Sequence, residues 1–465
     1  MVLSALQLAF LVLLPLLLGA AGLRALGLGF QSDPVGHLGW SWMVGSLFLA
    51  ALELLRLLSG LGSPGPLAAT GLLLAGVLLV LGRRNRPRTL SAHASEARPG
   101  RLFFQCVLAL ALAVTALRAI EANWSAIVRD DEALFWSKRA KLWFEARGFG
   151  GVYARALATK RFPNPDYPLL NPLLQLWCFD LAGRITHVVN RVPLQLCSLA
   201  LVLCTASALR RAAGPWLAGA LLILLVSSAP AVSAVGSASS DVLVALGSVV
   251  ALDAFLRGES ERERAWFALA GLAAAFLLWS KHEGLLIVAA FSAAYASVHR
   301  RRARELFSPR RAHLACLPAA CVLAITWIHN ACFATATNHA PWVGAFPGLA
   351  TDLGRDLAHT LEAFARVCFG PSMNYVFAAF LLLALLAPVA RRGRLAVVTL
   401  SLVLILLGLV VVYVAKESDP SQLLGNTLGR VLFHLEPPVL VWIACVADAL
   451  GAGRPELAGA VPRPG

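Results

Sequence analysis

Apolar runs of about 20 residues, separated by short polar breaks, follow one another along almost the whole chain. A helix that crosses a hydrocarbon core of ~30 Å needs roughly 20 apolar residues, so each run predicts one membrane span. The short alternating segments of a membrane β-barrel do not occur, so we expect helices. The expected spans are residues 2–23, 38–58, 66–82, 102–122, 192–209, 215–234, 241–256, 265–280, 284–298, 312–333, 374–390, 395–415 and 431–450.

The composition agrees with lipid as the solvent for most of the chain. Of 465 residues, 58% are hydrophobic and 14% are charged, and the mean hydropathy is +0.73, which excludes a soluble domain. The net charge of +15 comes from short basic clusters between apolar runs, so nucleic acid is not an expected partner. The nine cysteines lie mostly inside apolar runs without CxxC pairs, which favours small core residues; we expect neither a metal nor a cofactor.

Basic residues define the expected orientation, because cytoplasmic loops of membrane proteins carry an excess of Lys and Arg. Every second loop is strongly basic, so the loops at about 123–191, 235–240, 281–283, 334–373 and 416–430 are predicted to face outward. The first run lacks the basic start of a signal peptide and is treated as a retained span. The bias towards Arg, Ala and Leu indicates a GC-rich bacterial genome, and hence a multi-pass protein of the bacterial cytoplasmic (inner) membrane whose outward loops face the periplasm.

Most of the unusual polar residues fall on or beside the predicted outer face. Ionisable groups at membrane depth are costly and tend to be functional, whereas a solvated loop carries charge for solubility alone. Asp241 and the Lys281–Glu283 segment border apolar spans directly and are therefore the stronger candidates. The full set is Asp130, Asp131, Glu132, Asp166, Asp241, Lys281, His282, Glu283, His339, Asp352, Arg355, Asp356, Lys416, Glu417 and Arg430.

The first large outer loop, residues 128–180, is long and rich in aromatic residues. Residues 133–147 place Trp136, Ala140 and Trp143 on one stripe of a helix, which predicts an amphipathic helix in the interface with its Trp rings among the lipid headgroups. A simple anchor is the alternative. Asp131 and Glu132 precede this helix, where a structural cap competes with a catalytic role. Prolines stiffen the turn around Asp166 and Tyr167, and residues 169–179 predict a second short helix.

Six ordered motifs resemble those of GT-C fold glycosyltransferases, the superfamily of protein O-mannosyltransferases and lipid A aminoarabinose transferases. Five of them cover roughly residues 102–300, and a sixth resembles a segment near the end of some bacterial members. Three spans precede this core, so residues 1–101 are predicted to be an added module and residues 102–465 the catalytic core. The motifs are Asp131-Glu132 followed by LFWSKRAKLWF, PDYPLLNPLL (165–174), Arg191-Val192-Pro193, SASSD ending at Asp241, WSKHEG with Lys281, and NTLGRVLFHLEP (426–437).

The resemblance implies an all-α, GT-C-like bundle of about 11–13 transmembrane helices with amphipathic interfacial helices in the first large outer loop. It implies inverting sugar transfer from a polyprenyl-phosphate donor to a hydroxyl of a lipid, glycan or protein acceptor on the outer face. Such transfer requires a base and cationic groups for the departing phosphate. Asp131 is the expected base and Asp130 its substitute. Glu132 and Asp166 are implied to orient the acceptor, and Lys281, with Arg430 or His282, to neutralise the phosphate. Tyr167, Asp241 and Glu283 complete the implied substrate-binding residues.

Two alternative functions from other classes of protein remain open. A multi-span transporter predicts repeats, and broken helices with charge at mid-depth, but the sequence shows no repeat at a fixed period and its intramembrane acids lie at span ends. A non-catalytic membrane assembly subunit is the other reading. His282 beside Glu283 is not expected to bind a metal, because adjacent residues on a helix end point in different directions.

Overall fold

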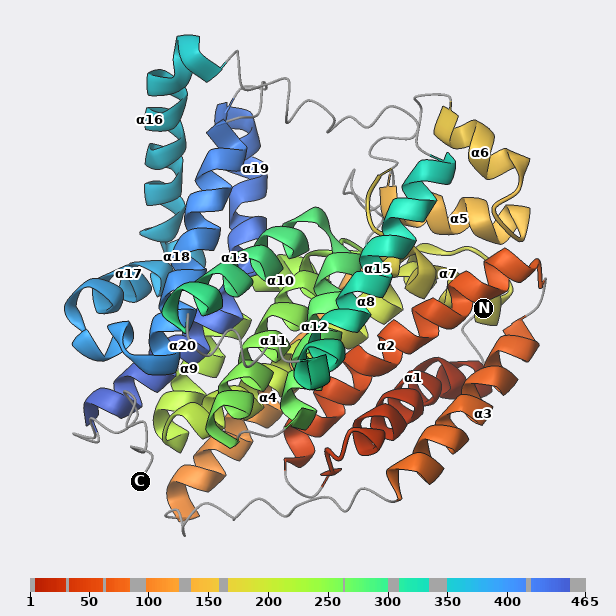
Figure 1. The fold of residues 1–465 in the computed structure, drawn as a ribbon, viewed down its shortest axis with the longest axis horizontal. Coiled ribbons are helices and arrows are strands. Elements are labelled where there is room, and N and C mark those ends of the chain that lie inside the picture. Colours follow the sequence, from red (N-terminus) through yellow and green to blue (C-terminus); the bar gives the residue numbers. More distant parts are fainter. Residues whose placement is uncertain are drawn as a thin grey trace.

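The computed structural model describes residues 5–30, 33–61, 64–83, 98–124, 135–158, 166–261, 264–299, 309–333, 349–414 and 420–451, and these residues form helices and no strand (Figure 1). The helices are α1 Ala5–Ala25, α2 Pro34–Ser59, α3 Pro64–Gly82, α4 Arg98–Trp124, α5 Ser137–Ala146, α6 Gly151–Ala158, α7 Leu170–Ala182, α8 His187–Ala212, α9 Pro215–Ser227, α10 Ala229–Val235, α11 Asp241–Glu261, α12 Arg264–Ser280, α13 His282–Val298, α15 Pro309–Phe333, α16 Leu349–Cys368, α17 Val376–Leu386, α18 Gly393–Val414, α19 Pro420–Phe433 and α20 Glu436–Gly451. Each expected span coincides with a helix or a pair of helices.

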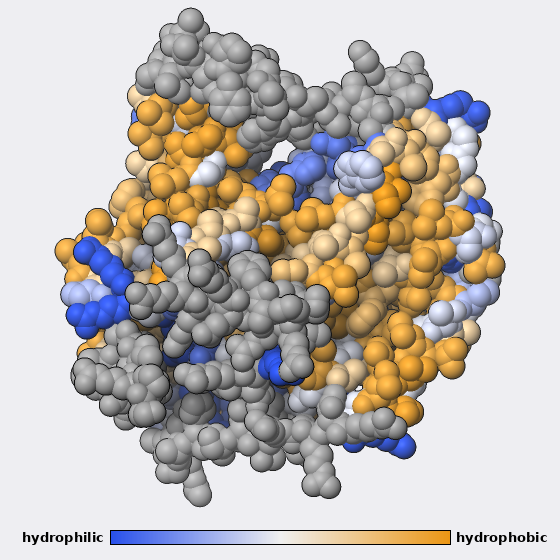
Figure 2. All heavy atoms as spheres, viewed as in Figure 1, coloured by the Kyte–Doolittle hydropathy of each residue, from blue (hydrophilic) through white to orange (hydrophobic). Residues whose placement is uncertain are grey.

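The chain is a multi-pass membrane protein. Seven helices of the described residues are long and apolar enough to cross a membrane, namely α1, α2, α3, α4, α8, α15 and α18. The count rises to nine if each of two bent pairs is one span: α9 with α10, which meet at 64°, and α19 with α20, which meet at 48°. Helices α12, α13 and α17 are apolar but shorter. Apolar side chains cover much of the surface in Figure 2, as expected for a protein whose flanks contact lipid.

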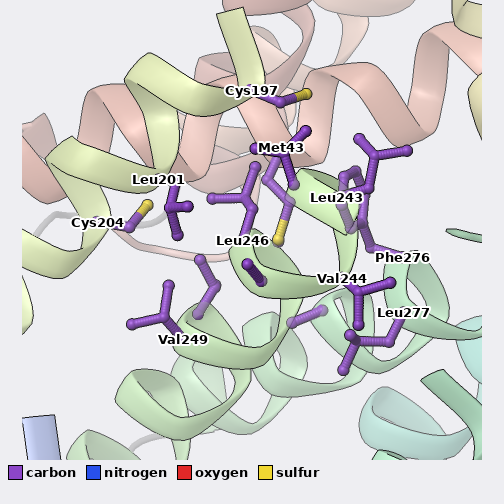
Figure 3. Packing of buried hydrophobic residues seen from close by; sticks show 14 of the residues in the cluster. Met43, Cys197, Leu201, Cys204, Leu243, Val244, Leu246, Val249, Phe276 and Leu277 are labelled. Atoms are coloured by element: carbon purple, nitrogen blue, oxygen red, sulfur yellow. The ribbon is translucent and has the colours of Figure 1, made fainter. Parts of the chain in front are cut away.

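The central core forms where α2, α8, α11 and α12 pack together. Met43 of α2 is fully buried and points towards Leu246 of α11 (Figure 3), while Cys197 of α8, also fully buried, accepts a hydrogen bond from Trp42 of α2 at 3.2 Å. Small residues allow the closest approach between α1 and α2, since a Cβ added at Gly45 would lie 1.7 Å from the carbonyl oxygen of Pro15. Helix α2 of the N-terminal segment therefore belongs to the same packed bundle as the helices that follow.

Buried ion pairs join the helices at both ends of this bundle. At one end, Asp33 before α2 forms an ion pair with Arg257 of α11, whose guanidinium lies 4.5 Å from the ring centre of Trp40 and 4.3 Å from that of Trp266. At the other end, Arg56 of α2 forms an ion pair with Asp180 of α7. Arg257, which the basic loops assign to the cytoplasmic side, therefore lies at the end of the bundle where α2 begins.

The first outer loop contains two of the expected helices, α5 and α7, and a third, α6. The stripe on α5 faces the protein: Trp136 is 3% exposed, and Ala140 and Trp143 are fully buried. The expectation that these Trp rings lie among lipid headgroups is therefore wrong. The stripe packs against α7 and α6, and Tyr153 of α6 is also fully buried. Helix α16, in a region expected to be a loop, is a further helix that the span pattern did not indicate.

Candidate functional site

Asp241 is the centre of a buried polar cluster at the end of the bundle that carries α5, α6 and α19. It is the first residue of α11 and is 2% exposed. Arg430 donates to its Oδ2 from Nε at 2.9 Å and from Nη2 at 2.8 Å. His434 Nε2 lies 3.1 Å from Oδ1, and Ser239 donates to Oδ2 at 2.9 Å. The helix N-terminus favours a carboxylate here, and these partners satisfy both of its oxygens.

Lys281 is the second ionic element of the cluster. It lies between α12 and α13 in extended backbone, and its Nζ is 3.2 Å from Asp241 Oδ1 and 2.9 Å from Glu283 Oε1. Burial alone lowers the pKa of Lys281, but attraction by Asp241 and Glu283 outweighs it and holds the pKa above its ordinary value. Lys281 is therefore a fixed cation. Two of its three N–H donors face these carboxylates.

The outer loop enters the cluster through Asp166 and Tyr167. Asp166 Oδ2 lies 3.2 Å from His282 Nε2, and the Tyr167 ring lies 4.9 Å from the His282 ring. Glu283 instead contacts Lys281, so the two adjacent residues of α13 do point in different directions. The turn before α7 and the turn between α12 and α13 thus meet, although more than a hundred residues separate them in the sequence.

Helix α5 fixes the position of Tyr167. Arg139, 2% exposed, donates to the Tyr167 carbonyl oxygen at 2.6 Å. Phe135 stacks on the Tyr167 ring at 6.1 Å, and Trp136 meets it edge-on at 5.2 Å. The aromatic and basic residues of the LFWSKRAKLWF segment therefore hold the outer-loop turn against α13.

The small-residue loop before Asp241 is held by α7. Asn171 is fully buried and donates to the carbonyl oxygen of Ala238 at 2.9 Å and to Ser240 Oγ at 3.0 Å. Gln175 donates to the Asn171 side chain at 2.8 Å. Serine and alanine in this loop leave room for the α7 amides to reach the backbone, so the local sequence positions Asp241 at the start of α11.

Two bent helix pairs meet beside the cluster. The first breaks at Ser228, between α9 and α10, and the second breaks at residues 434–435, between α19 and α20. Ser228 Oγ donates to Glu436 Oε2 at 2.8 Å, which links the two breaks. Glu436 is fully buried. His434 lies at the second break, and its ring nitrogen contacts Asp241. The break between α19 and α20 is therefore part of the cluster.

An apolar cavity of about 460 Å³ lies among α11, α12, α13, α15, α18 and α20. Leu277 and Ile287 line it, and each is four residues, or one helical turn of about 6 Å, from Lys281 or Glu283. Leu435, the neighbour of His434, lines it as well. An apolar space therefore begins one helical turn along the chain from Lys281.

No protein-family model, curated protein or solved structure matches the chain. The site must therefore be interpreted from its own chemistry. Within the described ranges, no three His, Cys, Asp or Glu residues are placed to hold a metal ion. Two cations, three carboxylates and two imidazoles gather in this cluster, in which His282 and Arg430 are partly exposed. Such groups can bind a charged ligand and exchange protons with a bound hydroxyl.

The structure brings together seven of the ten site residues expected from the sequence: Asp166, Tyr167, Asp241, Lys281, His282, Glu283 and Arg430. Asp130, Asp131 and Glu132 lie outside the described residues. His434 and Ser239 join the cluster without having been expected there. Their signal was present, because His434 follows Arg430 by four residues, one helical turn on the same face, and Ser239 belongs to the SASSD motif.

Proposed function

We propose that the protein is a membrane transferase that moves a sugar from a polyprenyl-phosphate donor to an acceptor hydroxyl, with the Asp241 cluster as its phosphate-binding site. The observation that supports this is that Lys281 and Arg430 both pair with Asp241, and that an apolar cavity begins one helical turn along the chain from Lys281. A polyprenyl phosphate needs a cationic site for its headgroup and an apolar space for its chain. The cluster offers the cations and the cavity offers the apolar space, so the two together match a donor of this kind.

In this proposal the cations stabilise the departing phosphate. Arg430 binds two oxygens through its planar guanidinium, and Lys281 acts as a point charge. Asp241 preorganises both side chains, so they need not reorder when negative charge develops on the leaving group. Asp166 of the outer loop contacts His282 of α13 and would orient the acceptor, while His282 would lie towards the phosphate.

Asp131 is the proposed base. It precedes Phe135 by four residues, so at most about 14 Å of extended chain separates the two. Phe135 stacks on Tyr167, and Tyr167 contacts His282. Chain connectivity therefore permits this carboxylate to reach the acceptor side of the cluster, with Asp130 as the substitute.

The test is transfer of a radiolabelled sugar from polyprenyl-phosphate donors by the full chain in nanodiscs. We expect Asp131→Asn to lower the rate about 100-fold or more, as loss of a general base does, and Lys281→Met to lower it strongly. Lys141→Met is the matched control, because Lys141 is exposed on α5 and contacts only Glu145 in a surface ion pair. Unimpaired transfer by Asp131→Asn would exclude the proposed base.

A transporter is the second candidate function, and the two bent helix pairs favour it. Discontinuous helices at a buried charged site are a feature of secondary transporters. The bond between Ser228 and Glu436 joins the two breaks next to Asp241. Proteoliposome flux of an anionic solute that Arg430→Gln abolishes, without transfer from any donor, would replace the transferase proposal by this one.

A further inference from the structure

A second cavity, of about 980 Å³, lies in the N-terminal segment, far along the sequence from the Asp241 cluster. It runs along α1 from Leu6 to Arg24, a helical distance of about 27 Å, and α2 and α3 contribute its walls. We call this cavity the α1 groove. It is of the same length scale as the hydrocarbon core of a bilayer, ~30 Å.

The polar residues of the α1 groove are gathered at one end. Arg24 is in the last turn of α1, and His37 and Ser41 lie in the first two turns of α2. His37 and Ser41 are buried and hydrogen-bond to each other at 3.2 Å. The remaining lining residues are apolar or glycine, so the groove has one polar and one apolar end.

Arg24 is an exposed cation, and no carboxylate of the described residues lies within ion-pair distance of it. Phe30 lies at the same end, 51% exposed, with its ring edge-on to His37 at 5.6 Å. Arg83, the residue directly after α3, is exposed as well, and its neighbour Gly82 packs against Arg24. Positive charge at this end therefore exceeds what the described residues neutralise, and it calls for an anionic ligand.

We propose that the α1 groove is a binding site for an anionic phospholipid, whose phosphate contacts Arg24 and whose acyl chains lie along α1. The charge complementarity selects the headgroup, because a guanidinium binds a phosphate through two oxygens. The apolar lining from Leu6 to Ala20 accepts the chains. The site is separate from the Asp241 cluster and does not depend on the proposed transferase activity.

The experiment uses the full chain in nanodiscs of phosphatidylglycerol and phosphatidylcholine in equal parts, followed by native mass spectrometry of the lipids that the released protein retains. We expect the wild-type chain to retain phosphatidylglycerol about tenfold over phosphatidylcholine. Arg24→Gln removes the phosphate contact and lowers this preference to near one. Arg392→Gln is the control: Arg392 is exposed, is predicted to be on the same side of the membrane, and does not line the groove.

A second variant tests whether the groove binds the acyl chains of the lipid rather than its headgroup. Ala20 lies one turn before Arg24 and lines the groove, so Ala20→Phe fills part of it and lowers retention of both lipids. Three results overturn the proposal: Arg24→Gln with the wild-type preference, equal retention of both lipids by the wild-type chain, or dimers that Ala20→Phe dissociates while lipid retention is unchanged. The last result would make the groove a contact between two copies of the chain.

Discussion

Lys281 Nζ lies 3.2 Å from Asp241 Oδ1, although 40 residues separate the two along the chain. Both side chains are buried, and Arg430 approaches the same carboxylate from α19. The contact fixes the turn between α12 and α13 against the start of α11. It also decides which substitutions the cluster tolerates, because each buried charge here is compensated by another.

Replacing Asp241 by Asn should destabilise the protein. The substitution leaves Lys281 and Arg430 facing each other without their shared carboxylate, and breaking a buried ion pair costs roughly 3–5 kcal/mol. Thermal unfolding of the purified chain in detergent measures this as a lower midpoint. Asp448→Asn is the control, since Asp448 is exposed on α20. The double variant Asp241→Asn with Lys281→Met should recover part of the loss; a double variant less stable than Asp241→Asn would contradict the pairing.

Gly284 allows α13 to pack closely against the end of α12. A Cβ added there would lie 2.1 Å from the carbonyl oxygen of Leu277, so Gly284→Ala must displace one helix and with it Lys281. We expect a lower unfolding midpoint. Gly76→Ala provides the contrast: nothing lies within 4 Å of the added Cβ on α3, and alanine favours a helix by up to about 1 kcal/mol. Equal effects of the two substitutions would refute the steric argument.

The ion pair at the opposite end of the bundle predicts a pH dependence. Burial raises the pKa of Asp33, but Arg257 and Arg211 outweigh it and hold the pKa below the ordinary 3.8. Because the unfolded chain takes up this proton first on acidification, the contribution of Asp33 to stability is complete above about pH 4 and declines as the pH falls below it. Unfolding midpoints between pH 3 and pH 6 measure this in detergent.

In that pH series, Asp33→Asn should be less stable than the wild-type chain at pH 6, and the difference should shrink towards pH 3. Glu121→Gln is the matched control, because Glu121 forms an exposed ion pair with Arg118 and surface pairs contribute little. A difference between wild type and Asp33→Asn that stays constant over the series would show that the charge of Asp33 is not responsible.

The helices of the bundle could be predicted from the sequence because span length follows from bilayer thickness and shows directly as apolar runs. The breaks at Ser228 and near His434 were not predicted, although the sequence signals both: Ser228 caps α10, which has Pro230 in its first turn, and Pro437 and Pro438 directly follow Glu436, the first residue of α20. The basic loops assign Arg211 and Arg257 to one side of the membrane, and the two do lie together at one end of the bundle, where both pair with Asp33.

The sequence predicts which residues form the candidate site, but it does not predict how they are arranged in space. Asp241 and Lys281 stood out because ionisable residues that border apolar spans are uncommon. His434 did not stand out by residue type, because a single histidine is more often an ordinary hydrogen-bonded residue; its signal was the four-residue spacing from Arg430. The burial of Trp136 and Trp143 was also hidden, because an amphipathic stripe has the same pattern whether it faces lipid headgroups or another helix.

The link between the two bent helix pairs gives the last prediction. Ser228→Ala removes the donor to Glu436 Oε2 and leaves a fully buried carboxyl group without that hydrogen bond, which costs about 1–3 kcal/mol. Glu436→Gln should be tolerated, since its amide oxygen accepts the same bond. Combining Ser228→Ala with Glu436→Leu removes both polar partners and should restore part of the stability in thermal unfolding. If the combined variant loses as much as the two single substitutions together, the two breaks do not stabilise each other through this contact.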